Sequence, residues 1–334
     1  MAFWKKKDGG GGGKRVRIFY ATDVHGSERT YRKFVNCAKV YKVDHLVMGG
    51  DIMGKFLIPI VDEGGGHYRV TLEEQLHHLD GADAVTDFKD RIETLGFYNV
   101  TVTEDELREM QADKSRVDEA FKREAHARLE RWIALADERL KGTEVKLYVT
   151  GGNDDPQHLM DVLENADSER VVNCEGRIVM LEDVYPMANC GWSNPTPWDT
   201  PRETDEEGLE KHLEDAVVGI DDFANAIFNM HVPPYDCTLD DAPKLDWSTD
   251  PPTPISVAGV PVSAPAGSTA VRKVIEKYQP LLQLAGHIHE SRGLVKLGRT
   301  TVINPGSEYG EGVIRGCIVT LEPGKVVGYQ MTSG

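Results

Sequence analysis

The sequence VKLYVTGGNDDP, Val145 to Pro156, places an apolar run directly before two glycines, an asparagine and two aspartates. Such a run is typical of a strand that is buried on both faces, and Pro156 prevents its regular continuation. Asn153, Asp154 and Asp155 are therefore expected at a strand end. Carboxamide and carboxylate oxygens are ligands for hard cations, although Asx and Gly residues also form ordinary turns. This stretch alone leaves both interpretations open.

Four other apolar runs in the chain also end at a cluster of polar residues. They are VRIFYA (16–21) before TDVHG, DHLVM (44–48) before GGD, AIFNM (226–230) before HVPP, and LLQLA (281–285) before GHIHES. A turn explains any one of these clusters, and a single D-x-H arises by chance in a chain of this size. Chance does not explain five of them, because open α/β sheets collect ligand sites at the carboxyl ends of their strands. The Asp, Asn and His side chains suffice for two divalent ions with mixed N and O ligands and argue against a thiolate zinc site.

The order of these clusters resembles the signature of the calcineurin-like metallophosphoesterases: D-x-H, G-D, G-N-H-D/E, a lone His and G-H-x-H. The motifs here are DVH, GGD, GGNDD, MH and GHIH, and NPGS follows at 304–307. The resemblance implies an α/β fold, built as a four-layer α-β-β-α sandwich, and two divalent transition-metal ions (Mn, Fe, Zn or Ni). It implies that one ion is held by Asp23, His25 and His289, the other by Asn153, His231 and His287, and that Asp51 bridges both.

A pair of such ions fits phosphoryl-transfer chemistry. Two divalent ions about 3.5 to 4 Å apart lower the pKa of a bridging water, hold the resulting hydroxide in line with phosphorus and neutralise the phosphate oxygens. We therefore expect a metal-dependent phosphoric ester hydrolase, a phosphodiesterase or phosphatase, with Asp51, Asn153 and Asp154 as catalytic residues. Arg202 and Arg292, on loops beside the ligands, are weaker candidates for binding phosphate.

Asp154 departs from the family pattern, which usually has a histidine after the asparagine that contacts the phosphate and helps the leaving group depart. Three explanations are open. Burial keeps Asp154 protonated; or Asp154 orients a histidine of residues 52–144, such as His67, His77 or His78; or acid assistance is unnecessary. The second and third are favoured, because a metal pair lowers the pKa of a carboxylate.

The segment 52–144 is too long for an ordinary crossover between two strands. It contains a capping-box pattern, Thr103-x-x-Glu106, and a helical stripe of apolar residues within 114–141. We expect a helical cap at 52–144, inserted into a metallophosphoesterase domain at 14–334, after a flexible Gly-rich tail at 1–13. Ser27 is expected to N-cap a helix between the first two strands.

Composition points to a soluble chain that avoids polyanions. The 334 residues carry a formal net charge of −17, and the segment 52–144 has 13 Lys and Arg against 21 Asp and Glu, a net charge of −8. A nucleic-acid-binding cap would be basic. The five cysteines are scattered without C-x-x-C, and no apolar run is long enough to cross a membrane. We expect a cytoplasmic protein without a membrane partner and with free thiols.

The expected substrate is a small phosphate ester, and the motifs do not distinguish monoesters from diesters. A nuclease acting on short or single-stranded nucleic acid is the alternative function. A non-catalytic metal-binding scaffold is a third possibility, which the presence of all seven ligand positions disfavours.

Overall fold

The computed structural model describes residues 15–246, 248–249 and 252–334, so the tail predicted at 1–13 lies outside the described residues. Six strands form a first sheet in the order β22-β21-β1-β2-β7-β8. Strands β1, β2, β7 and β8 run parallel, whereas β21 and β22 extend the sheet antiparallel. The strands are β1 (Val16–Ala21), β2 (His45–Gly49), β7 (Lys146–Thr150), β8 (Val171–Asn173), β21 (Arg315–Glu322) and β22 (Lys325–Ser333).

A second sheet has the order β19-β20-β18-β11-β10-β9. Its four middle strands are parallel, and an antiparallel strand closes each edge. The strands are β9 (Ile178–Leu181), β10 (Tyr185–Cys190), β11 (Ile227–Met230), β18 (Leu282–Leu284), β19 (Gly293–Leu297) and β20 (Thr300–Asn304). The five strands expected from the apolar runs are thus present, three in the first sheet and two in the second.

The two sheets pack against each other through one cluster of buried apolar side chains. Ile18 and Tyr20 of β1 belong to this cluster, together with Met187 of β10 and Leu284 of β18. Successive side chains of a strand point to opposite faces, so Phe19 of β1 belongs to a different cluster on the other face of the first sheet. Strands buried on both faces favour apolar residues, and the polar exceptions Asn229 and Gln283 are buried with hydrogen bonds.

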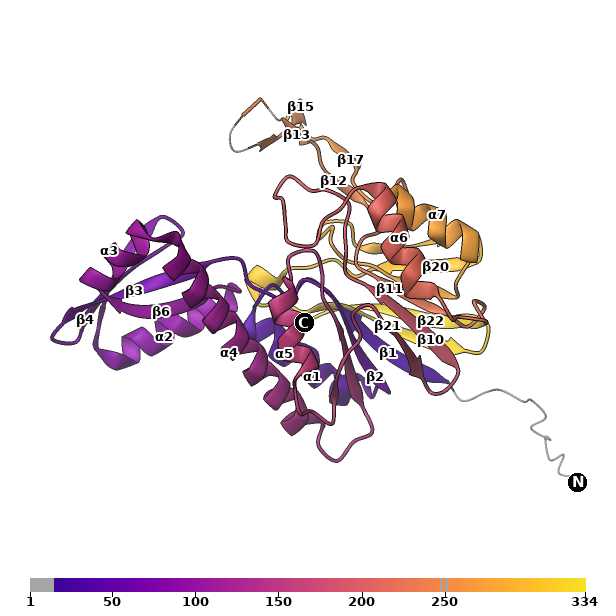
Figure 1. The fold of residues 1–334 in the computed structure, drawn as a ribbon, viewed down its shortest axis with the longest axis horizontal. Helices are drawn as coiled ribbons and strands as arrows, with labels where there is room; N and C mark the ends of the chain where they lie inside the picture. Colours follow the sequence, from indigo (N-terminus) through magenta and orange to yellow (C-terminus); the bar gives the residue numbers. More distant parts are fainter. Residues whose placement is uncertain (1–14, 247, 250–251) are drawn as a thin grey trace, which may run out of the picture.

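Helices cover the outer face of each sheet (Figure 1). Helices α1 (Glu28–Tyr41), α4 (Lys114–Leu140) and α5 (Gln157–Glu164) pack on the first sheet, and α6 (Glu206–Val217) and α7 (Thr269–Tyr278) pack on the second. The hydroxyl of Ser27 accepts a hydrogen bond from the backbone N–H of Thr30, which confirms Ser27 as the N-cap of α1. The stacked rings of Tyr31 and Trp132, with centroids 4.1 Å apart, join α1 to α4.

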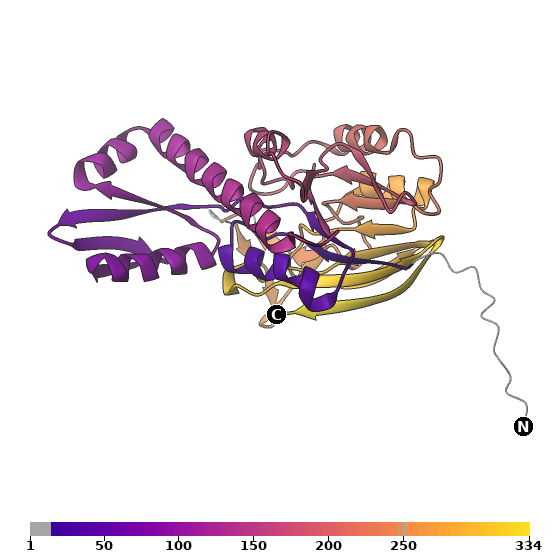
Figure 2. The same cartoon turned by 90° about the horizontal axis from the view of Figure 1, so that it is seen from below.

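The segment 52–144 extends to one side of the two sheets, and α4 returns from it to pack beside α1 and α5 (Figures 1 and 2). The expectation of a helical segment is wrong for part of this region, because it contains a four-stranded sheet in the order β5-β4-β3-β6. These elements are β3 (Leu57–Gly64), β4 (His67–Leu72), β5 (Gln75–Asp80), β6 (Tyr98–Thr103), α2 (Gly81–Thr94) and α3 (Glu104–Ala112).

The sequence explains why this segment forms a third sheet. Gly64, Gly65 and Gly66 all have positive φ, so they form the tight turn that pairs β3 with β4. Val70 and Leu72 alternate with more exposed residues in β4 and pack with α2. The capping box is confirmed at the start of α3, where Thr103 and Glu106 exchange hydrogen bonds.

The long segment 235–265 contains three short antiparallel ladders: β12 (Asp241–Pro243) with β17 (Ser263–Pro265), β13 (Leu245–Asp246) with β14 (Thr253–Pro254), and β15 (Ser256–Val257) with β16 (Val260–Pro261). A 3-10 turn, η1 (Tyr309–Glu311), follows NPGS. Among the helices of the described residues, none is long and apolar enough to cross a lipid bilayer.

Candidate metal centre

The candidate ligands lie in loops that leave the ends of neighbouring parallel strands. The loop after β1 is held to the loop after β2 by backbone hydrogen bonds from Asp23 N–H to the Gly50 carbonyl (3.0 Å) and from His25 N–H to the Asp51 carbonyl (2.9 Å). Because both strands end at the same edge of the sheet, these bonds bring DVH and GGD together. The loop after β7 supplies Asn153. The loops after β11 and β18, in the second sheet, supply His231, His287 and His289.

Four of the site residues have left-handed backbone conformations: Asp23 (φ 54°), His25 (φ 39°), Asp51 (φ 49°) and His287 (φ 66°). Non-glycine residues rarely adopt positive φ, and such strain gathers at functional sites. The hydrogen bonds between the loops, including those from His287 N–H to the Asp23 carboxylate (3.1 Å to each oxygen), hold these conformations. The backbone is therefore shaped to turn several side chains toward one point.

Two glycines allow the loops to approach this closely. A Cβ at Gly152 would overlap the carboxylate and backbone nitrogen of Asp51, and a Cβ at Gly286 would overlap Thr22 and the carboxylate of Asp23. Gly152 of GGND and Gly286 of GHIH thus have to be glycines, because the aspartates of the other motifs fill the space that a Cβ would need. A larger residue at either position would push one of the two candidate ligands away.

Asp155 is fully buried and holds the loop after β2 to the loop after β7. Its carboxylate accepts hydrogen bonds from the backbone N–H groups of Ile52 (2.9 Å), Met53 (2.8 Å) and Gly152 (2.8 Å). The second aspartate of GGNDD therefore positions the neighbouring loops. This role was not predicted from the sequence, which offered Asp155 only as part of a turn or as a cation ligand.

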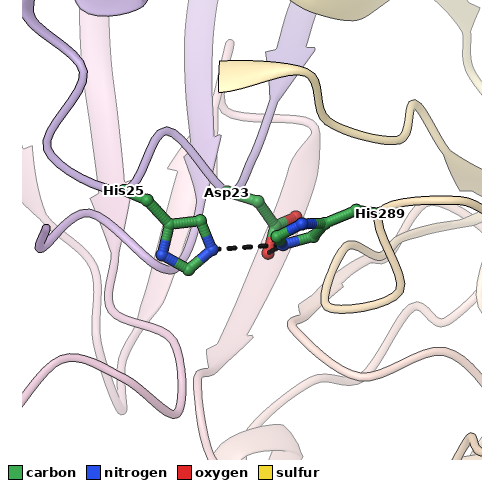
Figure 3. A group of neighbouring side chains, drawn as sticks. All are labelled: Asp23, His25 and His289. Atoms are coloured by element: carbon green, nitrogen blue, oxygen red, sulfur yellow. Dashed lines mark hydrogen bonds and ion pairs between the residues drawn. The ribbon is translucent and has the colours of Figure 1, made fainter. Parts of the chain in front are cut away.

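Asp23, His25 and His289 form the first group of candidate ligands, with one potential ligand atom from each residue within 4.8 Å of the others. Nε2 of His289 lies 3.4 Å from Oδ1 of Asp23 and 3.1 Å from Nε2 of His25. Figure 3 shows these side chains pointing toward one another, Asp23 and His25 from the loop after β1 and His289 from the loop after β18. These are the three residues predicted to share one ion.

Asp51, His231 and His287 form the second group. Oδ2 of Asp51 lies 3.4 Å from Nε2 of His231 and 3.6 Å from Nε2 of His25, so this carboxylate lies between the two groups, at the position expected for a bridging ligand. Oδ1 of Asn153 lies 2.8 Å from Nδ1 of His287. The structure therefore brings together all seven residues for which the sequence predicts ligand roles.

His231 tests whether this cluster fits a metal. Its Nδ1 lies 2.9 Å from the carbonyl oxygen of Gly49 and donates a hydrogen bond to it, which leaves the lone pair on Nε2 in the neutral ring. Nε2 is buried and has no hydrogen-bond partner among the described residues, and it faces the carboxylates of Asp51 and Asp23. In the neutral ring this lone pair would face carboxylates without a partner, so Nε2 must either take up a proton or share a divalent cation with them.

The charges of the cluster lead to the same conclusion. Burial lowers the pKa of His25 to about 3 and that of His287 to about 4, because it disfavours the imidazolium. At His231 burial acts in the same direction, but the carboxylates of Asp51 and Asp23 outweigh it and raise the pKa to about 10. Without a metal, His231 therefore carries a proton that compensates the carboxylates. A divalent cation would take over that compensation.

The surroundings of Asp154 differ from those expected. Its Oδ2 pairs with Nζ of Lys55 at 3.1 Å and lies 3.5 Å from Nδ1 of His25. Burial and the nearby Asp51 raise the pKa of Asp154 to about 6, whereas Lys55 acts in the opposite direction. The salt bridge with Lys55 argues against the protonated form.

The histidines expected to meet Asp154 have other partners. His67 contacts the Asp80 carboxylate at 2.7 Å and His77 packs against the ring of Phe88, both within residues 52–144. His77 and His78 lie on strand β5. The partner that the segment 52–144 supplies to Asp154 is thus a lysine.

Sequence reasoning missed two residues beside the cluster. One is Lys55, in the sequence GGDIMGK. The signal that could have found it is its position, four residues after the candidate ligand Asp51. The ring centroid of Tyr309, just after NPGS, lies 4.6 Å from that of His25.

The two arginines considered as phosphate ligands have other partners. Arg202 is buried, pairs with Glu175 and donates to the carbonyl of Gly152, and Arg292 donates to the carbonyl of Thr332. Both therefore support the structure around the site.

A cavity of about 520 Å³ lies elsewhere, between α4 and α5. Its lining includes His126 and His158, whose ring nitrogens lie 2.9 Å apart, together with several acidic residues. It contains none of the predicted site residues. The described residues that could hold a metal in groups of three are those of the loop cluster, not those of this cavity.

Comparison with known proteins gives one partial relative and similar solved structures. No protein-family profile matches the chain. The uncharacterized protein MJ1162 of Methanocaldococcus jannaschii is 30% identical over 156 residues, which are 46% of this chain and 61% of that protein. The alignment therefore spans less than two thirds of this relative.

Two solved structures are similar over 96% of this chain and 99% of theirs, each at 13% identity. One is a crystal structure with a TM-score of 0.57, and the other is the crystal structure of TT1561 of Thermus thermophilus, with a TM-score of 0.51. Such low identity shows the fold and not the activity. With two facing sheets and five motifs in the family's order at their strand ends, the chain has the fold of the calcineurin-like metallophosphoesterases.

Proposed function

We infer that the protein is a metal-dependent hydrolase of small phosphate esters. The observation that carries this inference is a cluster of seven side chains in which the Asp51 carboxylate lies near a histidine of each ligand group: Asp23, His25, Asp51, Asn153, His231, His287 and His289. The proposed fold is a four-layer α-β-β-α sandwich, with residues 52–144 inserted as a cap at one side. The cluster lies in loops, as expected for a site that must admit a substrate.

The donor set supports two divalent transition-metal ions. Imidazole, carboxylate and carboxamide ligands suit Mn, Fe, Zn or Ni better than Ca. Asp23, His25 and His289 would hold one ion, Asn153, His231 and His287 would hold the other, and Asp51 would serve both. When bound, the pair would supply an activated water as nucleophile and positive charge for the phosphate oxygens.

The residues around the ions have defined tasks in this proposal. The Gly49 carbonyl fixes the tautomer of His231, and Asp155 fixes the loops that carry Asp51 and Asn153. The backbone N–H of Asp154 donates to Oδ1 of Asp51 at 3.0 Å, which orients the bridging carboxylate. Such supporting bonds hold the site in its working geometry before the substrate arrives.

A nuclease is the second candidate, and the charge of the insertion argues against it. Residues 52–144 carry a net charge of −8, which would repel a long polyanion. A short phosphate ester that reaches the loops between the two sheets avoids most of this repulsion. We therefore propose a small phosphoester as substrate rather than a polynucleotide.

The test is a metal-reconstituted assay. The purified protein is loaded with Mn, Fe, Zn or Ni, its metal content is measured, and phosphomonoesters, linear diesters, cyclic nucleotides and short oligonucleotides are offered. We expect close to two ions per chain and hydrolysis of a small ester that stops on addition of a chelator. A protein that binds two ions but hydrolyses only oligonucleotides would be a nuclease. Absence of a tight divalent site would refute the proposal.

A further inference from the structure

Lys55 extends from the loop between β2 and β3 to the edge of the ligand cluster. Its Nζ lies 3.1 Å from Oδ2 of Asp154, and that oxygen lies 3.5 Å from Nδ1 of His25. Potential ligand atoms of Asp154, His25 and Asp51 all lie within 4.8 Å of one another. The Asp154 carboxylate thus lies between the Lys55 ammonium group and the candidate ligands His25 and Asp51.

The Lys55 ammonium is a permanent cation at neutral pH. Burial favours the neutral amine, but the carboxylates of Asp154 and Asp51 outweigh it and raise the pKa of Lys55. The side chain is 41% exposed, so it can be reached from solvent. An ammonium with a raised pKa is a poor proton donor near neutral pH, but it is an effective point charge for phosphate. Its chemistry suits anion binding.

The position of Asp154 explains why a cation is held here. Its carboxylate lies between Lys55 and the candidate ligand His25, where a negative charge without a partner would oppose the binding of an anion. Lys55 comes from the segment 52–144 and compensates that charge at the same edge of the cluster. Asp154 then holds the lysine in place rather than touching the substrate.

We propose that Lys55 binds a phosphoryl oxygen of the substrate, that Asp154 is the residue that positions it, and that this cation favours phosphomonoesters over phosphodiesters. The proposal rests on the proposed phosphoesterase function. A phosphomonoester carries nearly two negative charges at neutral pH and a diester carries one. A fixed cation beside the reacting phosphate therefore stabilises the bound monoester more strongly.

The first experiment measures binding without turnover. Inorganic phosphate is titrated by calorimetry into the metal-loaded wild type and into Lys55→Gln, Lys55→Arg and Lys114→Gln. We expect Lys55→Gln to bind phosphate about tenfold more weakly, as for the loss of a charge-assisted hydrogen bond. Lys55→Arg keeps the charge and should stay within about threefold of wild type.

The matched control is Lys114→Gln, which removes one positive charge from the exposed first residue of α4 and should leave phosphate affinity unchanged. Metal content and thermal unfolding of each variant show that ions and fold are retained. Affinity of Lys55→Gln within twofold of wild type would overturn the binding role.

The second experiment tests substrate class. We compare kcat/KM for p-nitrophenyl phosphate with kcat/KM for bis(p-nitrophenyl) phosphate, because both esters release the same leaving group, p-nitrophenolate. We expect the ratio of the first to the second to fall about tenfold in Lys55→Gln, and an equal loss on both esters would overturn the monoester preference. If the wild type hydrolysed no ester at all, the proposed function would fail, whereas the phosphate titration would still decide whether Lys55 binds the anion.

Discussion

At the scale of single residues, the site depends on where charges and lone pairs are held. Asp51 occupies the central place, with one carboxylate oxygen within 3.6 Å of histidines from both groups. Its other oxygen accepts the N–H of Asp154 at 3.0 Å. A neutral amide at this position would keep the shape of the side chain and remove the charge that both ions would share.

We therefore expect Asp51→Asn to lower kcat/KM by more than about 100-fold, since even residues that only support metal ligands account for 10–100-fold. The same variant should hold fewer than two ions. The comparison is His289→Gln, because His289 contacts only the first group and should affect one ion. Activity assays and elemental analysis on both variants measure this. Near-normal turnover and two ions in Asp51→Asn would show that Asp51 does not bridge.

At the scale of elements, α4 connects the insertion to the candidate site. Arg128 of this helix is buried and donates to the carbonyl oxygens of Gly26 (2.6 Å) and Phe97 (3.0 Å), and it pairs with Glu93 at 3.0 Å. Gly26 directly follows His25. A single side chain thus ties the long helix, the end of the insertion and the first ligand loop together.

Replacing Arg128 by leucine should lower the free energy of unfolding by about 3 to 5 kcal/mol, because it leaves a carboxylate and two carbonyl groups without their buried partner. Arg131→Leu is the matched control, since Arg131 lies 3.7 Å from the same Glu93 carboxylate but is 54% exposed. Arg131→Leu should lower the free energy of unfolding by less than about 1 kcal/mol. Urea unfolding of the three proteins measures the difference, and equal stability of the two variants would contradict the role of Arg128.

At the scale of the whole molecule, the proposed metal binding would be coupled to folding. A ligand that binds only the folded chain stabilises it by about 4 kcal/mol when its free concentration is about 1,000 times Kd. The ligands come from loops of both sheets, so removal of the ions leaves the carboxylates of Asp23 and Asp51 to be compensated by histidine protons.

This coupling predicts a pH dependence of metal affinity with a definite sign. The pKa of His231 is raised to about 10, so metal binding would displace its proton at neutral pH, and the raised pKa of His289 acts in the same direction. Affinity should rise with pH between 6 and 8, by about tenfold per pH unit for each proton displaced. Calorimetry in buffers of different ionisation enthalpy counts those protons. Thermal unfolding that is insensitive to both chelator and pH would contradict this coupling.

The sequence alone determined the local features, because they depend on neighbours along the chain. Continuous apolar runs predicted the five strands, Ser27 predicted the start of α1, and Thr103 with Glu106 predicted the start of α3. The clusters after those strands named seven residues that the structure brings to one point. Parallel strands share one edge, so strand ends far apart in sequence meet in space.

Only the tertiary structure decided which partners those residues meet. Three contacts join residues about 100 positions apart in the sequence: Lys55 with Asp154, Asp155 with Ile52, and Arg128 with Gly26. Asp155 also bonds to Gly152, which is close in sequence. The third sheet was missed for a related reason. Short alternating strands such as β4 and β5 give a weak pattern by themselves, and they become stable when they pair and pack against α2.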